Sequence, residues 1–164
     1  SEETIMGPVV SKKQWEKIQG YIGSALDEGA TLVTGGLGRP DHLPIGYYVQ
    51  PTVFTNVSTE MTIAREEVFG PVLCIIGFSN DDEAIEIANN TPFGLAAYVE
   101  SSNTNRAKAV ARKVRAGMVH LNGASADPGA PFGGYRQSGN GREWGVHGLE
   151  EFTELKAIMG YHQI

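Results

Sequence analysis

Hydrophobic residues in the first thirty positions recur with the period of an α-helix. One apolar stripe has members three or four residues apart, namely Trp15, Ile18, Ile22 and Leu26. Ser11 stands before this stripe as an N-cap, and Gly29 follows it as a stop signal. The pattern predicts an amphipathic helix between these two residues.

Short apolar runs after this helix predict strands. Residues 31–34 form the first run, which ends at a Gly-Gly pair, and residues 37–45 contain the glycine and prolines of a loop. Residues 47–54 are extended in pattern but are interrupted by Pro51. Because proline cannot donate a hydrogen bond to a ladder, we expect an edge or irregular strand there.

The next hundred residues alternate between strand and helix patterns. The apolar run at residues 72–78 is typical of a strand buried on both faces in a parallel sheet. Helical patterns follow at 80–90 and 104–114, and strand patterns at 95–99 and 118–122. This order predicts an α/β fold, a mostly parallel sheet with flanking helices and right-handed βαβ crossovers.

The C-terminal residues alternate loosely between apolar and polar positions from Glu151 to Tyr161, and no helical pattern follows them. We expect an extended strand that leaves the domain, with a partner subunit as one destination. The chain therefore divides into a main domain at 1–150 and a tail at 151–164.

A glycine-rich segment at residues 131–143, PFGGYRQSGNGRE, follows the last predicted strand of the sheet. Glycine tolerates positive φ and allows the backbone to approach a neighbour or ligand closely. One interpretation is a plain surface loop. The other is a site, because ligands of open α/β sheets bind beyond the carboxyl ends of the strands.

Three carboxylates allow two interpretations each. Glu66 and Glu67 are neighbours in an extended segment, so they point in opposite directions. One interpretation is that both carboxylates are solvated. The other is that one of them turns inward beside Phe69 and accepts hydrogen bonds from sugar hydroxyls. Glu143 either closes a capping box that begins at Asn140 and opens a short helix, or it transfers protons.

Composition and spacing exclude several classes of protein. The formal net charge is −6, which argues against a nucleic-acid surface. No apolar run is long enough to span a bilayer, and no signal peptide is visible, so a cytoplasmic protein is expected. Histidines and the single cysteine, Cys74, lack metal-ligand spacing, so no metal site is expected.

Cys74 lies within the apolar run, where burial favours an inert thiol over a nucleophile. The glycines spell neither a P-loop, which needs a following GK[ST], nor a GxGxxG that opens a βαβ unit. Neither of these nucleotide-binding fingerprints is therefore present.

Five motifs together resemble the C-terminal part of the NAD(P)-dependent aldehyde dehydrogenase family. In chain order they are Gln50–Val53, Glu66–Val72, Asn90–Leu95, Ala116–Asn122 and Pro131–Glu143. The resemblance covers the whole chain and about the last third of a full-length family member. It implies an aldehyde substrate and NAD or NADP as cofactor.

The resemblance also implies a role for individual residues. Glu67 matches the carboxylate that binds the nicotinamide ribose hydroxyls, and Phe69 matches an aromatic residue near the nicotinamide. Phe132 matches an aromatic residue of the aldehyde tunnel. Glu143 matches a carboxylate that relays protons in part of the family.

Residues 123–130, with Ala124 and Ser125, match the variable loop at the tunnel mouth. The tail from Phe152 matches a strand that crosses to a neighbouring subunit, so the resemblance implies a homo-oligomer.

The nucleophilic cysteine, the general-base glutamate and the cofactor domain of that family precede the matched motifs, and Cys74 lies in a different motif. Covalent chemistry needs a thiolate and a base within reach of each other. We therefore expect a C-terminal fragment that is inactive alone. The alternatives are a non-catalytic oligomerising module and part of a CoA-acylating semialdehyde dehydrogenase.

Overall fold

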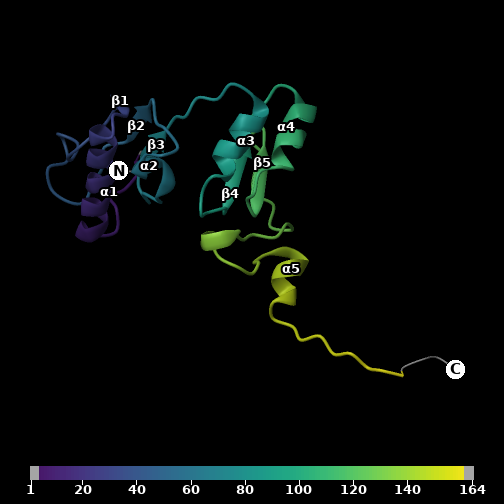
Figure 1. The fold of residues 1–164 in the computed structure, drawn as a ribbon. Coiled ribbons are helices and arrows are strands. Elements are labelled where there is room, and N and C mark those ends of the chain that lie inside the picture. Colours follow the sequence, from purple (N-terminus) through teal and green to yellow (C-terminus); the bar gives the residue numbers. More distant parts are fainter. Residues whose placement is uncertain (1–3, 161–164) are drawn as a thin grey trace. The chain divides into compact units, whose positions relative to one another are not determined.

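The computed structural model describes residues 4–160 (Figure 1). The chain falls into two compact units that divide between Asn80 and Asp81. The first unit contains α1 (Lys12–Asp27), β1 (Thr31–Thr34), β2 (Thr52–Thr55), α2 (Thr62–Arg65) and β3 (Val72–Cys74). The second contains α3 (Asp81–Asn89), β4 (Ala96–Val99), α4 (Thr104–Ala111), β5 (Met118–Leu121), the 3₁₀ turn Arg136–Ser138 and α5 (Gly145–Glu150).

Helix α1 begins and ends where its sequence signals stand. The Ser11 hydroxyl accepts a hydrogen bond from the backbone N–H of Gln14 at 3.2 Å, and Gly29 follows the helix with φ +93°. The apolar stripe is buried at Ile18 and Ile22, whereas Leu26 is partly exposed and Ala25 is buried instead. The predicted helix is therefore confirmed, with its buried face rotated slightly at the C-terminal end.

The core of the first unit lies between α1 and the sheet. Its buried members are Ile18, Ile22, Ala25, Ala30, Val49, Phe54, Val57 and Ile63. Phe54, from β2, has no exposed surface. Burial of one such large side chain contributes about 1.5–3 kcal/mol, so this cluster is the main source of stability in the unit.

The first sheet has the order β1-β2-β3, with β1 antiparallel and β3 parallel to β2. Of the two expectations for residues 47–54, the edge strand is wrong, because β2 is the central strand. The irregular strand is confirmed, because β2 begins only after Pro51 and its pairing with β1 contains a register shift. Pro51 does not prevent the central placement, because it precedes the first ladder residue, and the N–H of Thr52 donates to the carbonyl oxygen of Pro71 at 2.9 Å.

Strand β3 is shorter than the apolar run that predicts it. Its parallel pairing with β2 is confirmed, but burial on both faces is wrong for this chain: Leu73 is 58% exposed, and Ile75 and Phe78, which follow the strand, are also exposed. Within residues 4–80, no layer covers these side chains.

The second unit contains a parallel β4-β5 pair with α4 as the crossover between the two strands. In Figure 1, α3 and α4 lie beside this pair. The Arg106 guanidinium of α4 binds the Asp81 carboxylate of α3, with an Nη2–Oδ1 distance of 2.6 Å. The expected βαβαβ series is thus divided, because β3 belongs to the first sheet and β4 and β5 form a second one.

The tail beyond α5 contains no strand in residues 151–160, and these residues are exposed. Figure 1 shows this segment running away from α5. The predicted C-terminal strand is absent from the described part of the tail, where no partner strand is present to satisfy its backbone hydrogen bonds. Residues 161–164 lie outside the described range. None of the described helices is long and apolar enough to cross a membrane.

Candidate active site

The loop at residues 66–70 of the first unit carries Glu67 and Phe69, and α1 holds its backbone. The Gln14 side-chain amide donates to the carbonyl oxygens of Val68 and Phe69, each at 3.1 Å. The Lys17 ammonium donates to the carbonyl oxygen of Glu67 at 3.1 Å. Three consecutive carbonyl groups are therefore bound by one helix.

Three side chains of this loop are exposed to solvent, namely Glu66, Glu67 and Phe69, whereas Val68 packs against the core. Glu66 and Glu67 are both exposed, and neither turns inward. Phe69 is 74% exposed and has φ +54°, a conformation that is uncommon for a bulky residue. The Glu67 carboxylate and the Phe69 ring, two positions apart, are thus both exposed on a constrained backbone. Such a pair can accept hydrogen bonds from paired hydroxyls and cover an apolar ring.

The glycine segment of the second unit is folded back on itself by Phe132 and Glu143. Their backbones form an antiparallel bridge, with N–H to carbonyl distances of 2.7 Å in both directions. The Phe132 ring packs on the Trp144 ring with centroids 5.0 Å apart. The Arg142 guanidinium donates to the carbonyl oxygens of Gly134 at 3.0 Å and Gly141 at 2.6 Å.

Of the two interpretations of Glu143, the capping box from Asn140 to Glu143 is wrong. Helix α5 begins only at Gly145, after Trp144 at φ +64°, and Glu143 lies in the β-bridge instead. The two backbone hydrogen bonds with Phe132 hold Glu143 in extended conformation, which is incompatible with a helical N3 position. Gly148 of α5 then packs directly on the Glu143 backbone, where a Cβ atom would lie 2.6 Å from its carbonyl carbon.

Phe132 and Glu143 line one cavity of about 300 Å³. Its other lining residues are Leu95, Gly133, Gly134, Ser138, Asn140, Gly141, Arg142, Glu151 and Phe152. The base of the tail therefore forms part of the wall near the two motif residues. The structure brings together Phe132 and Glu143, which are eleven positions apart in the sequence.

Ala124 and Ser125 belong to a second cavity, of about 290 Å³, which does not include Phe132 or Glu143. Trp144 and His120 supply aromatic surface there. The His120 ring stacks on Tyr98 at 4.8 Å, and its Nδ1 lies 2.9 Å from the carbonyl oxygen of Ala124. Strand β5 thereby holds the start of the loop at residues 123–130.

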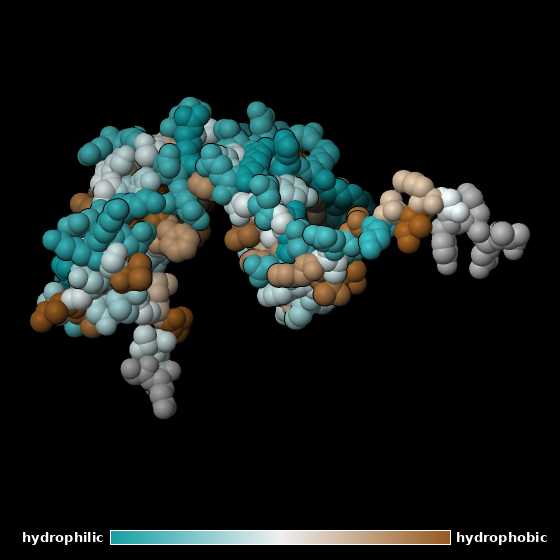
Figure 2. Space-filling model, turned by 90° about the horizontal axis from the view of Figure 1, so that it is seen from below, coloured by the Kyte–Doolittle hydropathy of each residue, from teal (hydrophilic) through white to brown (hydrophobic). Residues whose placement is uncertain are grey.

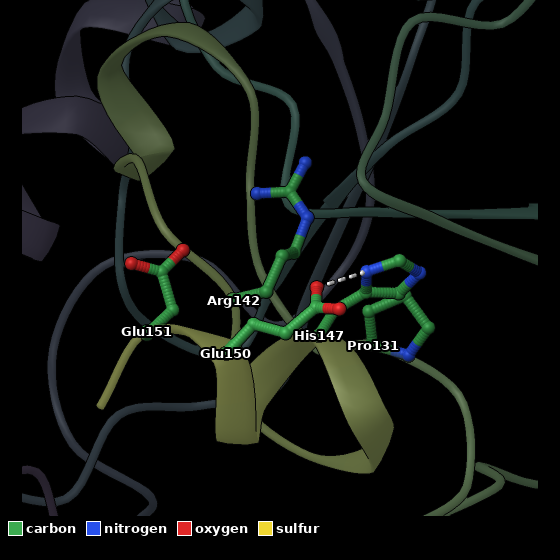
Figure 3. A pocket seen from close by; sticks show the side chains of 5 residues that line it. All are labelled: Pro131, Arg142, His147, Glu150 and Glu151. Atoms are coloured by element: carbon green, nitrogen blue, oxygen red, sulfur yellow. Dashed lines mark hydrogen bonds and ion pairs between the residues drawn. The ribbon is translucent and has the colours of Figure 1, made fainter. Parts of the chain in front are cut away.

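A third cavity, of about 480 Å³, lies at the end of α5 and is lined mostly by ionisable side chains. Figure 3 shows the five side chains that line it, which are Pro131, Arg142, His147, Glu150 and Glu151. His147 and Glu150 face each other, with Nδ1 and Oε2 3.2 Å apart. Both are solvent-exposed, so their interaction is weak.

The environment of the Cys74 thiol is consistent with an inert group. Burial raises the pKa of this thiol above its ordinary value, which lowers the thiolate fraction at neutral pH. Among residues 4–160, no group of three or more His, Cys, Asp or Glu side chains could hold a metal ion.

Sequence reasoning missed the supporting residues of both loops. Gln14 and Lys17 are on the polar side of an amphipathic helix, and their three-residue spacing was the only signal that they act together. Trp144 follows the motif directly, and its ring contact with Phe132 depends on the bridge. Arg142 is inside the motif, but its carbonyl partners were not predictable from its position.

The chain belongs to the aldehyde dehydrogenase family, whose model matches residues 1–158. It is 57% identical over 159 residues to a 3-succinoylsemialdehyde-pyridine dehydrogenase of a Pseudomonas species. That match covers 97% of this chain and 33% of the relative. The chain thus spans about a third of the length of the curated relatives that it matches.

Solved structures agree with this assignment. Aldehyde dehydrogenase C of Pseudomonas syringae, a mutant complexed with NAD+ and octanal, matches with TM-score 0.96 and 50% identity, over 100% of this chain and 34% of that one. A Mycobacterium tuberculosis aldehyde dehydrogenase complexed with NAD+ matches with TM-score 0.90 and 45% identity, over 96% of this chain and 33% of that one.

Proposed function

We propose that this chain is the C-terminal part of an NAD(P)-dependent aldehyde dehydrogenase. Such an enzyme converts an aldehyde, water and NAD(P)+ to a carboxylate, NAD(P)H and protons. The observation that carries the proposal is the Phe132–Glu143 bridge, which places an aromatic ring and a carboxylate on one cavity. Family membership and the NAD+ complexes of similar solved structures supply the chemical context.

Glu67 and Phe69 fit a nicotinamide nucleotide in their chemistry. The Glu67 carboxylate is exposed and can accept hydrogen bonds from two vicinal ribose hydroxyls, while the exposed Phe69 ring offers apolar surface to a planar ring. The cofactor, when bound, accepts a hydride from the substrate. The contribution of this chain is to hold the ribose end of the cofactor and to exclude water beside it.

On the substrate side, Phe132 lines the aldehyde tunnel, and the loop with Ala124 and Ser125 lies at the tunnel mouth. Glu143 relays a proton between the site and solvent, which its exposed position on the cavity wall allows. A CoA-acylating semialdehyde dehydrogenase is the alternative within the same family. The products distinguish the two, because one releases a free carboxylate and the other an acyl-CoA.

The 164 residues alone do not oxidise aldehydes under this proposal. Their one thiol, Cys74, has a raised pKa and lies in β3. The test is to incubate the purified chain with octanal and NAD+ and to follow NADH absorbance. Steady NADH formation, abolished by Cys74→Ser, would contradict the proposal.

The tail is proposed to pair with a second copy of the chain. Its exposed apolar residues are Phe152, Leu155, Ile158 and Met159. Figure 2 shows exposed hydrophobic surface along this segment. Exposed apolar side chains on an unpaired extended segment favour association. Removal of residues 151–164 is expected to lower the mass measured by light scattering, and an unchanged mass would contradict this role.

A further inference from the structure

We propose that Gln14 and Lys17 of α1 are positioning residues for the loop at 66–70. This inference rests on the proposed function, in which Glu67 and Phe69 contact the cofactor. Neither residue lies in any of the five family motifs, and α1 carries none of the proposed site residues. The role assigned to α1 is to fix the backbone from which both contacts project.

The three hydrogen bonds from α1 require an unusual backbone. In an extended chain, successive carbonyl groups point to opposite sides. The carbonyl groups of Glu67, Val68 and Phe69 nevertheless all accept donors from α1. The left-handed conformation of Phe69, with φ +54°, reverses the chain so that its carbonyl group and that of Val68 converge on one amide nitrogen of Gln14.

An apolar contact completes the attachment. A Cβ atom at Gly70 would lie 2.5 Å from Cδ1 of Ile18, so the loop backbone lies directly against this buried residue. Gln14 is four residues before Ile18 and three residues before Lys17, so Gln14 lies next to both of them on the helix surface. The Lys17 ammonium is also 5.4 Å from the Tyr21 ring centroid, which restricts the lysine.

The hydrogen bonds from α1 use only backbone atoms of the loop. Val68 also packs against the core, whereas the side chains of Glu67 and Phe69 stay exposed. Within residues 4–160, the Glu67 carboxylate makes no hydrogen bond or ion pair, and the Phe69 ring is largely exposed. A loop held in one conformation loses less entropy when it binds a ligand than a mobile loop does. Without the α1 donors, Phe69 would return to an extended conformation, and its ring and the Glu67 carboxylate would separate.

The first test measures the loop itself in the 164-residue chain. Gln14→Leu and Lys17→Met remove the donors and keep an apolar side chain of similar bulk. Cleavage by a glutamate-specific protease after Glu67 is quantified by mass spectrometry relative to cleavage after Glu154 in the exposed tail. We expect the ratio to rise about threefold to tenfold in each variant, as loss of one or two hydrogen bonds implies.

The controls separate positioning from general damage to α1. Gln19→Leu is matched to Gln14→Leu, because Gln19 is on the same helix and accepts a hydrogen bond from the N–H of Gly38 at 2.6 Å in a different loop. It is expected to leave cleavage after Glu67 unchanged. Lys17→Arg keeps a donor and is expected to restore protection. An unchanged cleavage ratio in both Gln14→Leu and Lys17→Met overturns the proposal, whether or not the KM for NAD+ changes.

The second test uses the complete enzyme that the proposed function implies. The KM for NAD+ is expected to rise about threefold to tenfold in Gln14→Leu, with the aldehyde KM unchanged. Greater cleavage after Glu67 without a change in the NAD+ KM would support the attachment of the loop to α1 but reject the cofactor role of Glu67. A higher NAD+ KM without greater cleavage would indicate direct cofactor contact by Gln14 and overturn its positioning role.

Discussion

Phe132 and Glu143 each donate a backbone hydrogen bond to the other, and both N···O distances are 2.7 Å. The bridge places the two residues on one cavity without using either side chain. Substitutions of the two side chains can therefore test their chemistry while the backbone pairing stays intact. Gly148 packs against the Glu143 backbone and connects the bridge to α5 and the tail.

Glu143→Gln tests the proposed proton relay. The amide keeps the size of the side chain but cannot take up and release a proton, so kcat of the complete enzyme is expected to fall about 10²-fold. Circular dichroism is expected to be unchanged, since the bridge uses only backbone atoms. Glu151→Gln is the matched control on the same cavity, and its kcat is expected to stay within twofold, about 0.4 kcal/mol. A normal kcat in Glu143→Gln would reject the relay.

Phe132→Ala is expected to destabilise the second unit. The half-buried ring would lose its packing on Trp144, at an expected cost of about 2 kcal/mol, roughly half that of a fully buried phenylalanine. Urea unfolding followed by Trp144 fluorescence in a Trp15→Phe background measures this loss. Phe152→Ala, at a residue that is 89% exposed, is the control and should change stability by less than about 0.5 kcal/mol. Equal effects of the two substitutions would contradict the packing argument.

Two glycine-to-alanine substitutions are expected to have opposite effects. A Cβ atom at Gly117 would overlap the carbonyl oxygen of Gly133, so Gly117→Ala should destabilise the second unit by about 3 kcal/mol. Gly20 lies within α1 with no atom near its Cβ position, and Gly20→Ala should stabilise the first unit by about 0.5–1 kcal/mol. Differential scanning calorimetry measures both changes. An unchanged stability in Gly117→Ala would show that β5 and the glycine segment are not closely packed at this position.

Glu28 is expected to make the first unit sensitive to acid. Its carboxylate accepts hydrogen bonds from the Thr62 hydroxyl at 2.6 Å, the Ser24 hydroxyl at 2.8 Å and the Thr62 N–H at 2.7 Å. These bonds, the Thr62 hydroxyl first, lower the pKa of Glu28 in the folded state. A lowered folded-state pKa stabilises the fold above the unfolded value, about 4.3, and that contribution is lost as pH falls through the folded value.

Urea midpoints measured from pH 7 to pH 3 test this linkage. Glu28→Gln is expected to reduce stability at pH 7 and to flatten its decline at the acid end. Thr62→Val, which removes the hydroxyl donor, should reproduce part of that effect. Identical slopes for Glu28→Gln and the unsubstituted chain would show that the carboxylate does not contribute.

Local sequence determined those features whose information lies within one element. The apolar stripe with Ser11 and Gly29 specifies α1, because periodicity and capping act over a few residues. The five motifs identified the family, because each motif is a short contiguous pattern of residue types and the five follow one another in the expected order. For the same reason, Glu67, Phe69, Phe132 and Glu143 could be selected as candidates before any geometry was known.

Only the tertiary structure decided how these elements pair. Pro51 indicated an edge strand, yet β2 is central, because the choice of neighbours depends on β1 and β3. The sequence from Asn140 to Glu143 matches a capping box, yet Glu143 pairs with Phe132 in the structure. Two backbone hydrogen bonds across the glycine segment prevail there over the local helical signal. The hydrogen bond from the Gln14 amide to the Phe69 carbonyl oxygen joins residues 55 positions apart. Contacts of this kind depend on the packing of α1 against the sheet, which no local pattern in the sequence encodes.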